Sequence, residues 1–119
     1  MSPFELGAVI PIIQSGPDRA APRWSDVLAQ ARRAEDIGFG TIWVPDELLW
    51  QTDDGPPRGA WDGVSMAAAV AATTSRIRTG TWVLSALHRN PGILAKTAET
   101  LDEISGGRFV FGLGAGHEW

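Results

Sequence analysis

The polar residues best suited to chemistry in this sequence follow segments that we expect to form β-strands. Asp46 and Glu47 follow one such segment, His88 follows the next, and His117 follows the last. A carboxylate or an imidazole at such a position can accept or donate a proton near neutral pH. We take all four as candidate catalytic residues, with a solvated loop charge as the alternative for Glu47. We expect Asp46, His88 and His117 to converge on one cleft.

A glycine-rich segment follows the last predicted strand. Gly112, Gly114 and Gly116 alternate there with Leu113 and Ala115. Glycines after a strand let backbone N–H groups approach a planar ring or a phosphate, and they equally permit a tight barrel corner. Both interpretations stand. The spacing G-x-G-x-G differs from the G-x-G-x-x-G fingerprint of dinucleotide-binding folds.

The sequence does not predict other kinds of site. No G-x-S-x-G segment provides a nucleophilic serine. His88 and His117 lie on different loops, and no H-x-H or H-E-x-x-H pattern brings two imidazoles together, so we expect no metal site. The sequence has no Cys, which excludes disulfides and thiolate catalysis.

Hydrophobic periodicity and capping signals predict the elements that position these residues. Ser25 and Asn90 are the expected N-caps of two helices, and Gly38 is expected to end the first helix. The expected elements are, in chain order, strand 4–13, helix 24–37, strand 41–44, helix 62–75, strand 79–84, helix 90–105 and strand 108–113. Almost continuously apolar strands that alternate with helices predict an α/β fold with a parallel sheet.

The long connections of this predicted sheet all follow strands. Segments 14–23 and 45–61 are long, whereas the connections from helix to strand are only two residues or so. Ligands of parallel α/β folds bind at the carboxyl ends of the strands, so this side of the sheet is the expected working face. Segment 45–61 is rich in Gly, Pro and Asp, and we expect it to act as a lid.

The number of predicted units indicates part of a barrel. A closed eight-stranded (β/α)8 barrel needs about 250 residues, and this sequence has 119. We therefore expect residues 1–119 to be the N-terminal half of such a barrel and a fragment of a longer protein. In the whole barrel, inward side chains are expected from Val9, Ile42, Val83 and Phe111, or from their neighbours.

The composition narrows the class of partner. Lys and Arg number 10 and Asp and Glu number 14, which gives a net charge of −4 with no basic stripe. Nucleic acid is therefore not an expected partner. No apolar run approaches the roughly 18 residues of a membrane span, so we expect no membrane association and a cytoplasmic protein.

Four segments, taken together and in order, resemble the luciferase-like monooxygenase family. They carry the runs AEDIGFGTIWVPD, TSRIRTGT, HRNP with LAK, and LDEISGGRF leading into GLGAG. The segments with this resemblance are 34–46, 74–81, 88–96 and 101–116. The order and spacing of these segments match the family pattern over nearly the whole chain.

The resemblance implies a barrel that binds FMN, or the deazaflavin F420, over the carboxyl ends of its strands. It implies a non-prolyl cis peptide at Trp82-Val83, behind the flavin ring. It places the family's phosphate-binding residues largely in later barrel units. The cofactor-binding residues that it implies here are Trp82, Val83, Leu84, Ser85, Gly112, Gly114, Ala115 and Gly116.

Two departures from the family pattern bear on the reaction. Many relatives have Asp-His where this chain has Asp46-Glu47, and sugar-phosphate dehydrogenases place a Glu where this chain has His117. The interpretation that we prefer is a monooxygenase that uses reduced FMN and O2 on a small organic substrate and forms a homo-oligomer as a full-length protein. The alternatives are F420-dependent hydride transfer and an inactive fragment whose sheet edges mediate association.

Overall fold

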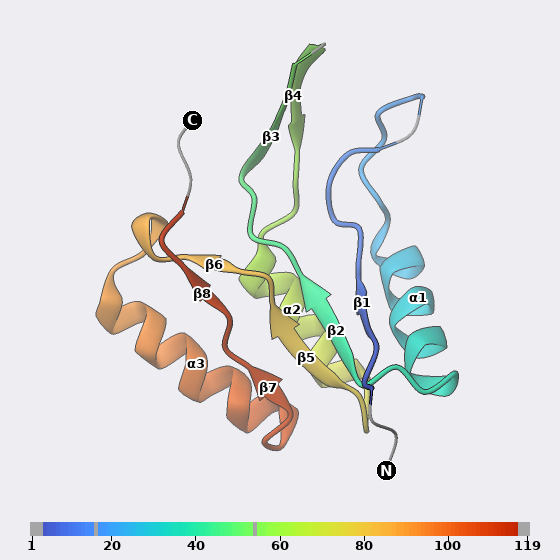
Figure 1. Cartoon of the computed structure of the whole chain (residues 1–119), viewed down its shortest axis with the longest axis vertical. Coiled ribbons are helices and arrows are strands. Elements are labelled where there is room, and N and C mark those ends of the chain that lie inside the picture. The colour runs from blue at the N-terminus through green and yellow to red at the C-terminus, as the bar shows by residue number, and fades with distance from the viewer. Residues whose placement is uncertain (1–3, 16, 54, 117–119) are drawn as a thin grey trace.

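The computed structural model describes residues 4–15, 17–53 and 55–116. Helices and strands alternate along the chain, which confirms the predicted α/β class (Figure 1). The elements are, in order, β1 (Gly7–Val9), α1 (Trp24–Asp36), β2 (Thr41–Val44), β3 (Leu49–Thr52), β4 (Gly55–Gly59), α2 (Gly63–Thr73), β5 (Arg78–Thr81), β6 (Leu84–Ser85), a 3-10 turn (Ala86–His88), α3 (Pro91–Ser105), β7 (Phe109–Val110) and β8 (Leu113–Gly114).

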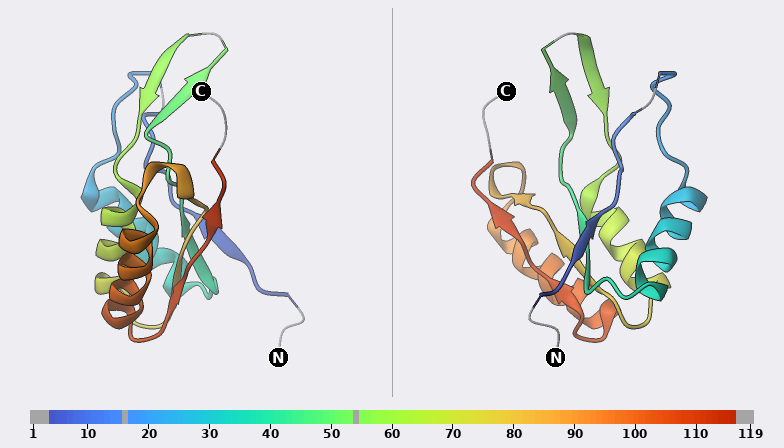
Figure 2. Two further views of the ribbon diagram at one scale, coloured as in Figure 1. Left: turned by 90° about the vertical axis from the view of Figure 1, so that its left-hand side faces the viewer. Right: turned by 45° about the vertical axis from the view of Figure 1, so that its right-hand side comes forward.

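The main sheet has four strands in the order β1-β2-β5-β7, and every neighbouring pair is parallel. All three helices cover one face of this sheet, and the opposite face is bare (Figure 2). Parallel strands with helices on one side form a sector of a (β/α) barrel, in which the bare face is the inside. The carboxyl ends of the strands share one edge, as predicted.

The helix ends follow mostly from capping chemistry. Asp62 precedes α2, and its carboxylate accepts the Ser65 N–H at 2.7 Å. Asn90 caps α3, and Gly106 ends it in the left-handed conformation, as expected. The prediction of Ser25 as the first N-cap is wrong, because Ser25 lies within α1, whose N-cap position is Arg23, two residues earlier, with no capping side chain.

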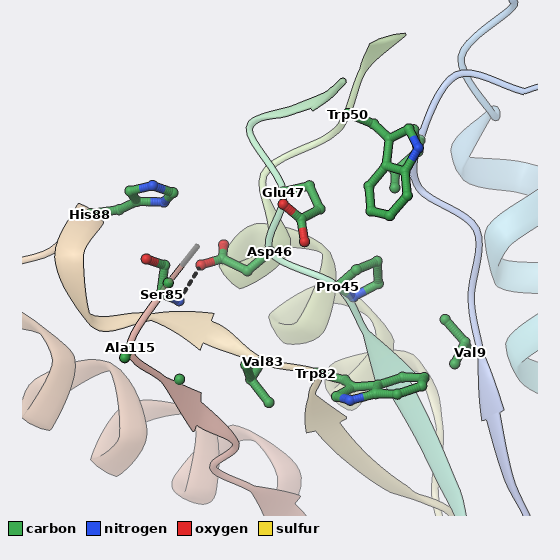
Figure 3. A pocket seen from close by; sticks show the side chains of 13 residues that line it. Val9, Pro45, Asp46, Glu47, Trp50, Trp82, Val83, Ser85, His88 and Ala115 are labelled. Atoms are coloured by element: carbon green, nitrogen blue, oxygen red, sulfur yellow. Dashed lines mark hydrogen bonds between the residues drawn. The ribbon is translucent and has the colours of Figure 1, made fainter. Parts of the chain in front are cut away.

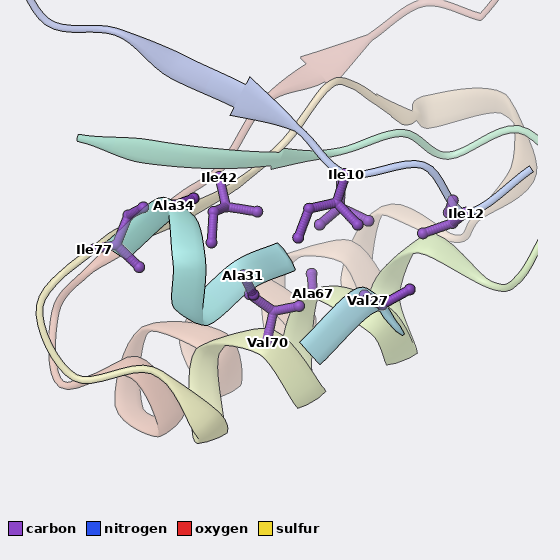
Figure 4. Packing of buried hydrophobic residues seen from close by; sticks show 10 residues of the cluster. Ile10, Ile12, Val27, Ala31, Ala34, Ile42, Ala67, Val70 and Ile77 are labelled. Atoms are coloured by element: carbon purple, nitrogen blue, oxygen red, sulfur yellow. The ribbon is translucent and has the colours of Figure 1, made fainter. Parts of the chain in front are cut away.

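The hydrophobic core lies between the sheet and the helices (Figure 4). Ile10, just after β1, and Ile42 of β2 pack on Val27, Ala31 and other buried residues of α1 and α2. The expected inward residue of this strand was Ile42 or a neighbour, and Ile42 itself packs on the helices, because alternate side chains of a strand face opposite sides of a sheet. Its neighbour Trp43 takes the inner side instead.

The indole of Trp43 lies across the inner face of the sheet. Trp43 pairs with Val9 of β1 and Gly80 of β5 in the strand register. A Cβ added to Gly7 or to Gly80 would overlap atoms of the Trp43 ring. The indole therefore spans three strands, and glycines on both flanking strands make room for it.

The segment after β2 differs from the predicted loop. It forms an antiparallel hairpin, β3-β4, which projects beyond the carboxyl edge of the sheet (Figure 1). Pro56 and Pro57 within β4 argue against a strand in the sequence. Their carbonyl oxygens both accept N–H groups of Arg19 at 2.8 Å, so the loop after β1 supports this strand from the side.

Glu35 ties α1 to the loop that enters β5. One oxygen of its carboxylate accepts the backbone N–H groups of Ser75, Arg76 and Ile77 at 2.9, 2.6 and 3.0 Å. Burial raises the pKa of Glu35, but these hydrogen bonds and the charge of Arg76 outweigh it, and the net pKa lies below its ordinary value of 4.5. The ionised carboxylate is therefore part of the folded structure.

We predict that Glu35→Gln lowers the Tm at pH 7 by roughly 5 °C. A group whose pKa is lowered by folding stabilises the fold above its unfolded pKa and loses this effect as the pH falls through the folded value. The difference in Tm between variant and wild type should therefore become smaller below about pH 4.5. Thermal denaturation followed by circular dichroism at several pH values measures it. Glu99→Gln, at an exposed surface pair with Lys96, is the control and should change little. A difference that is independent of pH would contradict the assignment.

Candidate functional site

A cavity of about 540 Å³ opens at the carboxyl edge of the sheet, below the hairpin (Figure 3). Its apolar wall comes from three different segments, namely the end of β1, the loop and hairpin after β2, and the junction between β5 and β6. The apolar lining residues are Val9, Ile13, Pro45, Trp50, Trp82 and Val83. A concave, mostly apolar site of this size is typical of small-molecule and cofactor binding.

Polar side chains gather on the other side of this cavity. Glu47 extends into it next to Trp50, whereas His88 lies above Ser85 (Figure 3). The backbone of Gly114, Ala115 and Gly116 completes the wall. The cavity therefore offers a carboxylate, an imidazole and a hydroxyl around an apolar floor.

Asp46 is engaged by protein groups on both of its oxygens. Its side chain is 1% exposed and forms an ion pair with Arg89, which is 15% exposed. Arg89 donates to both carboxylate oxygens, with 2.7 Å for the contact to Oδ1. The Ser85 N–H donates to Oδ2 at 2.9 Å (dashed in Figure 3). Hydrogen bonding to Asp46 raises the pKa of Arg89, so its guanidinium stays charged.

The predicted third strand is divided into two. The Trp82-Val83 peptide is cis, as predicted, and separates β5 from β6. Before this bond the strand pairs with β7, and after it with β8. The predicted fourth strand is divided in the same way. The division turns Trp82, Val83 and Ser85 toward the two hollows of the inner face.

The glycine-rich segment is explained by close strand packing. A Cβ on Gly112 would overlap the carbonyl oxygen of Thr81, and one on Gly114 would lie 2.5 Å from Val83 Cγ2. A Cβ on Gly116 would lie 3.0 Å from Ser85 Oγ. Gly112, Gly114 and Gly116 therefore face Thr81, Val83 and Ser85, in this order. This geometry favours the barrel-corner interpretation of G-x-G-x-G over a phosphate cradle.

Most of the predicted site residues line this one cavity. Asp46 and His88 lie on it together, as expected, and His117 falls outside the described residues. Leu84 does not line it, because its side chain points to the opposite face and is fully buried. Gly112 borders the adjoining hollow over β2 and β5 instead. The residues of the expected set that line the cavity are Asp46, Glu47, Trp82, Val83, Ser85, His88, Gly114, Ala115 and Gly116.

Sequence reasoning missed two important residues. Trp50 reaches the cavity from the hairpin, and a large aromatic side chain in a long loop after a strand could have signalled it. Arg89 is the second, and it is not among the predicted site residues. Its partner Asp46 lies 43 residues away in sequence, so no local pattern indicates the pair.

The Ser85 hydroxyl is an unusual feature of the cavity. Ser85 is 7% exposed, and its Oγ has no hydrogen-bond partner within the described part of the chain. A buried hydroxyl without a partner costs free energy, and such groups commonly mark a place where a ligand or water binds. Ser85 is therefore the polar side chain in this cavity that is best placed to meet a ligand.

A parallel βα sheet with helices on one face only and a cavity at its carboxyl edge is the architecture of the (β/α)-barrel class. Within this class, the chain belongs to the luciferase-like monooxygenase family, whose model matches residues 4–119. An F420-dependent glucose-6-phosphate dehydrogenase of Amycolatopsis mediterranei (strain U-32) is 36% identical over 93 residues, which are 76% of this chain and 27% of that protein. The 4-hydroxyprotoasukamycin monooxygenase of Streptomyces nodosus subsp. asukaensis is 33% identical over 119 residues, 98% of this chain and 30% of that protein.

Solved structures agree with this assignment. An F420-dependent secondary alcohol dehydrogenase, solved with an F420-acetone adduct, superposes with a TM-score of 0.75 at 28% identity and covers 94% of this chain and 32% of its own. The chain spans less than a third of these relatives, so its fold is a partial barrel. Within the described ranges, no helix is long and apolar enough to cross a membrane.

We predict that Gly112→Ala destabilises the fold by about 3 kcal/mol, because a methyl group here can be accommodated only if the Thr81 backbone moves. Urea denaturation measures the change. Gly55→Ala is the matched control, because the nearest atom to its Cβ would be Thr52 Oγ1 at 3.7 Å. Equal effects at the two positions would contradict the packing explanation of the glycine segment.

We predict that Ser85→Ala raises the Tm of the unliganded chain, because it removes a buried polar group that lacks a partner. The free energy of unfolding should increase by about 1 kcal/mol. Ser105→Ala is the control with the opposite sign, since the Ser105 hydroxyl donates to the Asp102 carbonyl and accepts from the Arg108 N–H, both at 3.0 Å. Thermal denaturation compares both variants with wild type. A loss of stability in Ser85→Ala would show that the hydroxyl is already bonded within the protein.

Proposed function

We propose that this chain forms the ring-binding part of the active site of a flavin- or deazaflavin-dependent oxidoreductase that acts on a small organic molecule. The observation that carries the proposal is the apolar cavity at the carboxyl edge with the unpartnered Ser85 hydroxyl in its wall. Membership of the luciferase-like family supports it. Relatives that depend on F420, and a type II Baeyer-Villiger monooxygenase of the same fold solved with FMN, support both cofactors.

The described residues fit an isoalloxazine or deazaflavin ring. Such a ring is flat and largely apolar, with hydrogen-bonding atoms at its edge, and the cavity combines an apolar floor with a buried hydroxyl. Trp82 and Val83 would contact the face of the ring, and Ser85 Oγ would bond its edge. The bound ring would supply the electron-pair chemistry of the reaction.

The remaining side chains of the cavity would handle protons and exclude water. Glu47 and His88 are ionisable groups on the cavity wall, which is where a substrate above the ring would need a proton donor or acceptor. Trp50 on β3 would shield the substrate side from solvent. Asp46 has both oxygens bound to Arg89 and Ser85, so we assign it a structural role in place of the catalytic role first expected.

For the cofactor, we prefer reduced FMN with O2, and therefore a monooxygenase reaction. Many relatives have an Asp-His pair where this chain has Asp46-Glu47, and the family resemblance associates that His with the deazaflavin dehydrogenases. Glu47 in its place disfavours their reaction. F420-dependent hydride transfer is the second candidate, favoured by the similarity to F420-dependent dehydrogenases. The third candidate is a chain without activity of its own, because it spans less than a third of its relatives.

Titration of this chain with lumiflavin, FMN and F420, followed by ring fluorescence, tests the proposal. We expect lumiflavin and FMN to bind alike and weakly, with Kd on the order of 0.1–1 mM, because the described residues would contact the ring and offer no cradle for the phosphate of FMN. Trp82→Ala should weaken binding several-fold. Trp24→Ala, on α1 and outside the cavity lining, is the control.

Two outcomes would contradict this account. No saturable binding of any ring at millimolar concentration would remove the proposal that the cavity is a ring site. Micromolar binding of FMN but not of lumiflavin would show that this chain also holds the phosphate, against the expectation that later barrel units do so.

A further inference from the structure

We propose that Arg89 is a positioning residue of the cavity, which acts through Asp46 on Ser85 and on the loops that carry Glu47 and His88. The inference rests on the proposed function in one respect, namely that Ser85 is a contact of the bound ring. Arg89 itself does not line the cavity. Its effect on a ligand would therefore be indirect.

The first step of the argument is connectivity. Asp46 follows β2, whereas Ser85 ends β6 and Arg89 lies just before α3, so the cluster joins the segment after β2 to a stretch of chain 39 to 43 residues away. The chain neighbours of the ion pair are both cavity residues, because Glu47 follows Asp46 and His88 precedes Arg89. The ion pair therefore also fixes the backbone positions of Glu47 and His88.

The second step concerns the orientation of the Asp46 carboxylate. The planar guanidinium of Arg89 donates to both of its oxygens, which leaves the carboxylate a single orientation. In this orientation Oδ2 accepts the Ser85 N–H. The Ser85 backbone is thus held by a charged acceptor, while its buried hydroxyl has no hydrogen-bond partner among the described residues. A Lys at position 89 would keep the charge but could not hold both oxygens in this way.

The third step concerns charge. Arg89 also lies 3.5 Å from Asp62, the N-cap of α2, so one guanidinium serves two carboxylates. The nearly complete burial of Asp46 makes this arrangement costly to break, because an unpaired buried charge would remain. The cluster therefore links the start of α2 to the cavity wall and resists displacement.

The experiment measures hydrogen exchange of the Ser85 amide by NMR and lumiflavin affinity by fluorescence in wild type, Arg89→Lys and a double variant, Asp46→Asn with Arg89→Gln. The double variant removes both charges together and keeps the proposal testable if Arg89→Lys does not fold. The control is Arg76→Lys, which alters an exposed ion pair with Asp36. Thermal denaturation reports the global stability of each variant.

We expect Arg89→Lys to fold, to exchange the Ser85 amide about tenfold faster, and to bind lumiflavin about threefold more weakly. The double variant should show the same two changes, and the control neither. Wild-type exchange at Ser85 together with wild-type affinity in both Arg89 variants would overturn the proposal. A uniform increase in exchange over all core amides would also overturn it, because that result indicates only a loss of stability. If the wild type does not bind lumiflavin, the proposed function fails. Exchange of the Ser85 amide still decides whether Arg89 positions Ser85.

Discussion

The geometry of the cavity depends on a single buried ion pair, between Asp46 and Arg89. Parallel strands bring their carboxyl ends to one edge of the sheet, but the hydrogen bonds of this sheet do not fix the segments that leave these ends. The bidentate pair supplies a fixed point for two of these loops and for the end of β6. We therefore assign Asp46, a catalytic candidate in the sequence, a structural role in the site.

A second constraint is the close approach of the third and fourth strands. Both strands are divided, so that β5 pairs with β7 and β6 pairs with β8. Thr81 Oγ1 accepts the Gly112 N–H at 3.1 Å and donates to its carbonyl at 2.9 Å, which joins the strands where they change partners. The glycines permit this contact, and it turns alternate residues of the third strand toward the cavity.

The class of fold and most elements could be predicted from the sequence, because periodicity and caps such as Asn90 are local signals. The working edge could be predicted for the same reason, and so could most residues that line the cavity. The hairpin could not be predicted, because prolines are unfavourable in strands and β4 contains two of them. The contact with Arg19 that supports β4 comes from a distant part of the sequence. The pairing of Asp46 with Arg89 was hidden because it exists only once the loops are folded together. The cis bond was predicted only through family resemblance, as no propensity indicates it.

The indole of Trp43 makes three positions of the sheet interdependent. It occupies the space that Cβ atoms at Gly7 and Gly80 would need, so none of the three can change freely while the others stay the same. In evolutionary terms these positions should covary: an aliphatic residue in place of Trp43 frees room for side chains on both flanking strands. Engineers who redesign the interior of this barrel would have to treat the three sites as one unit of substitution, drawn from β1, β2 and β5 together.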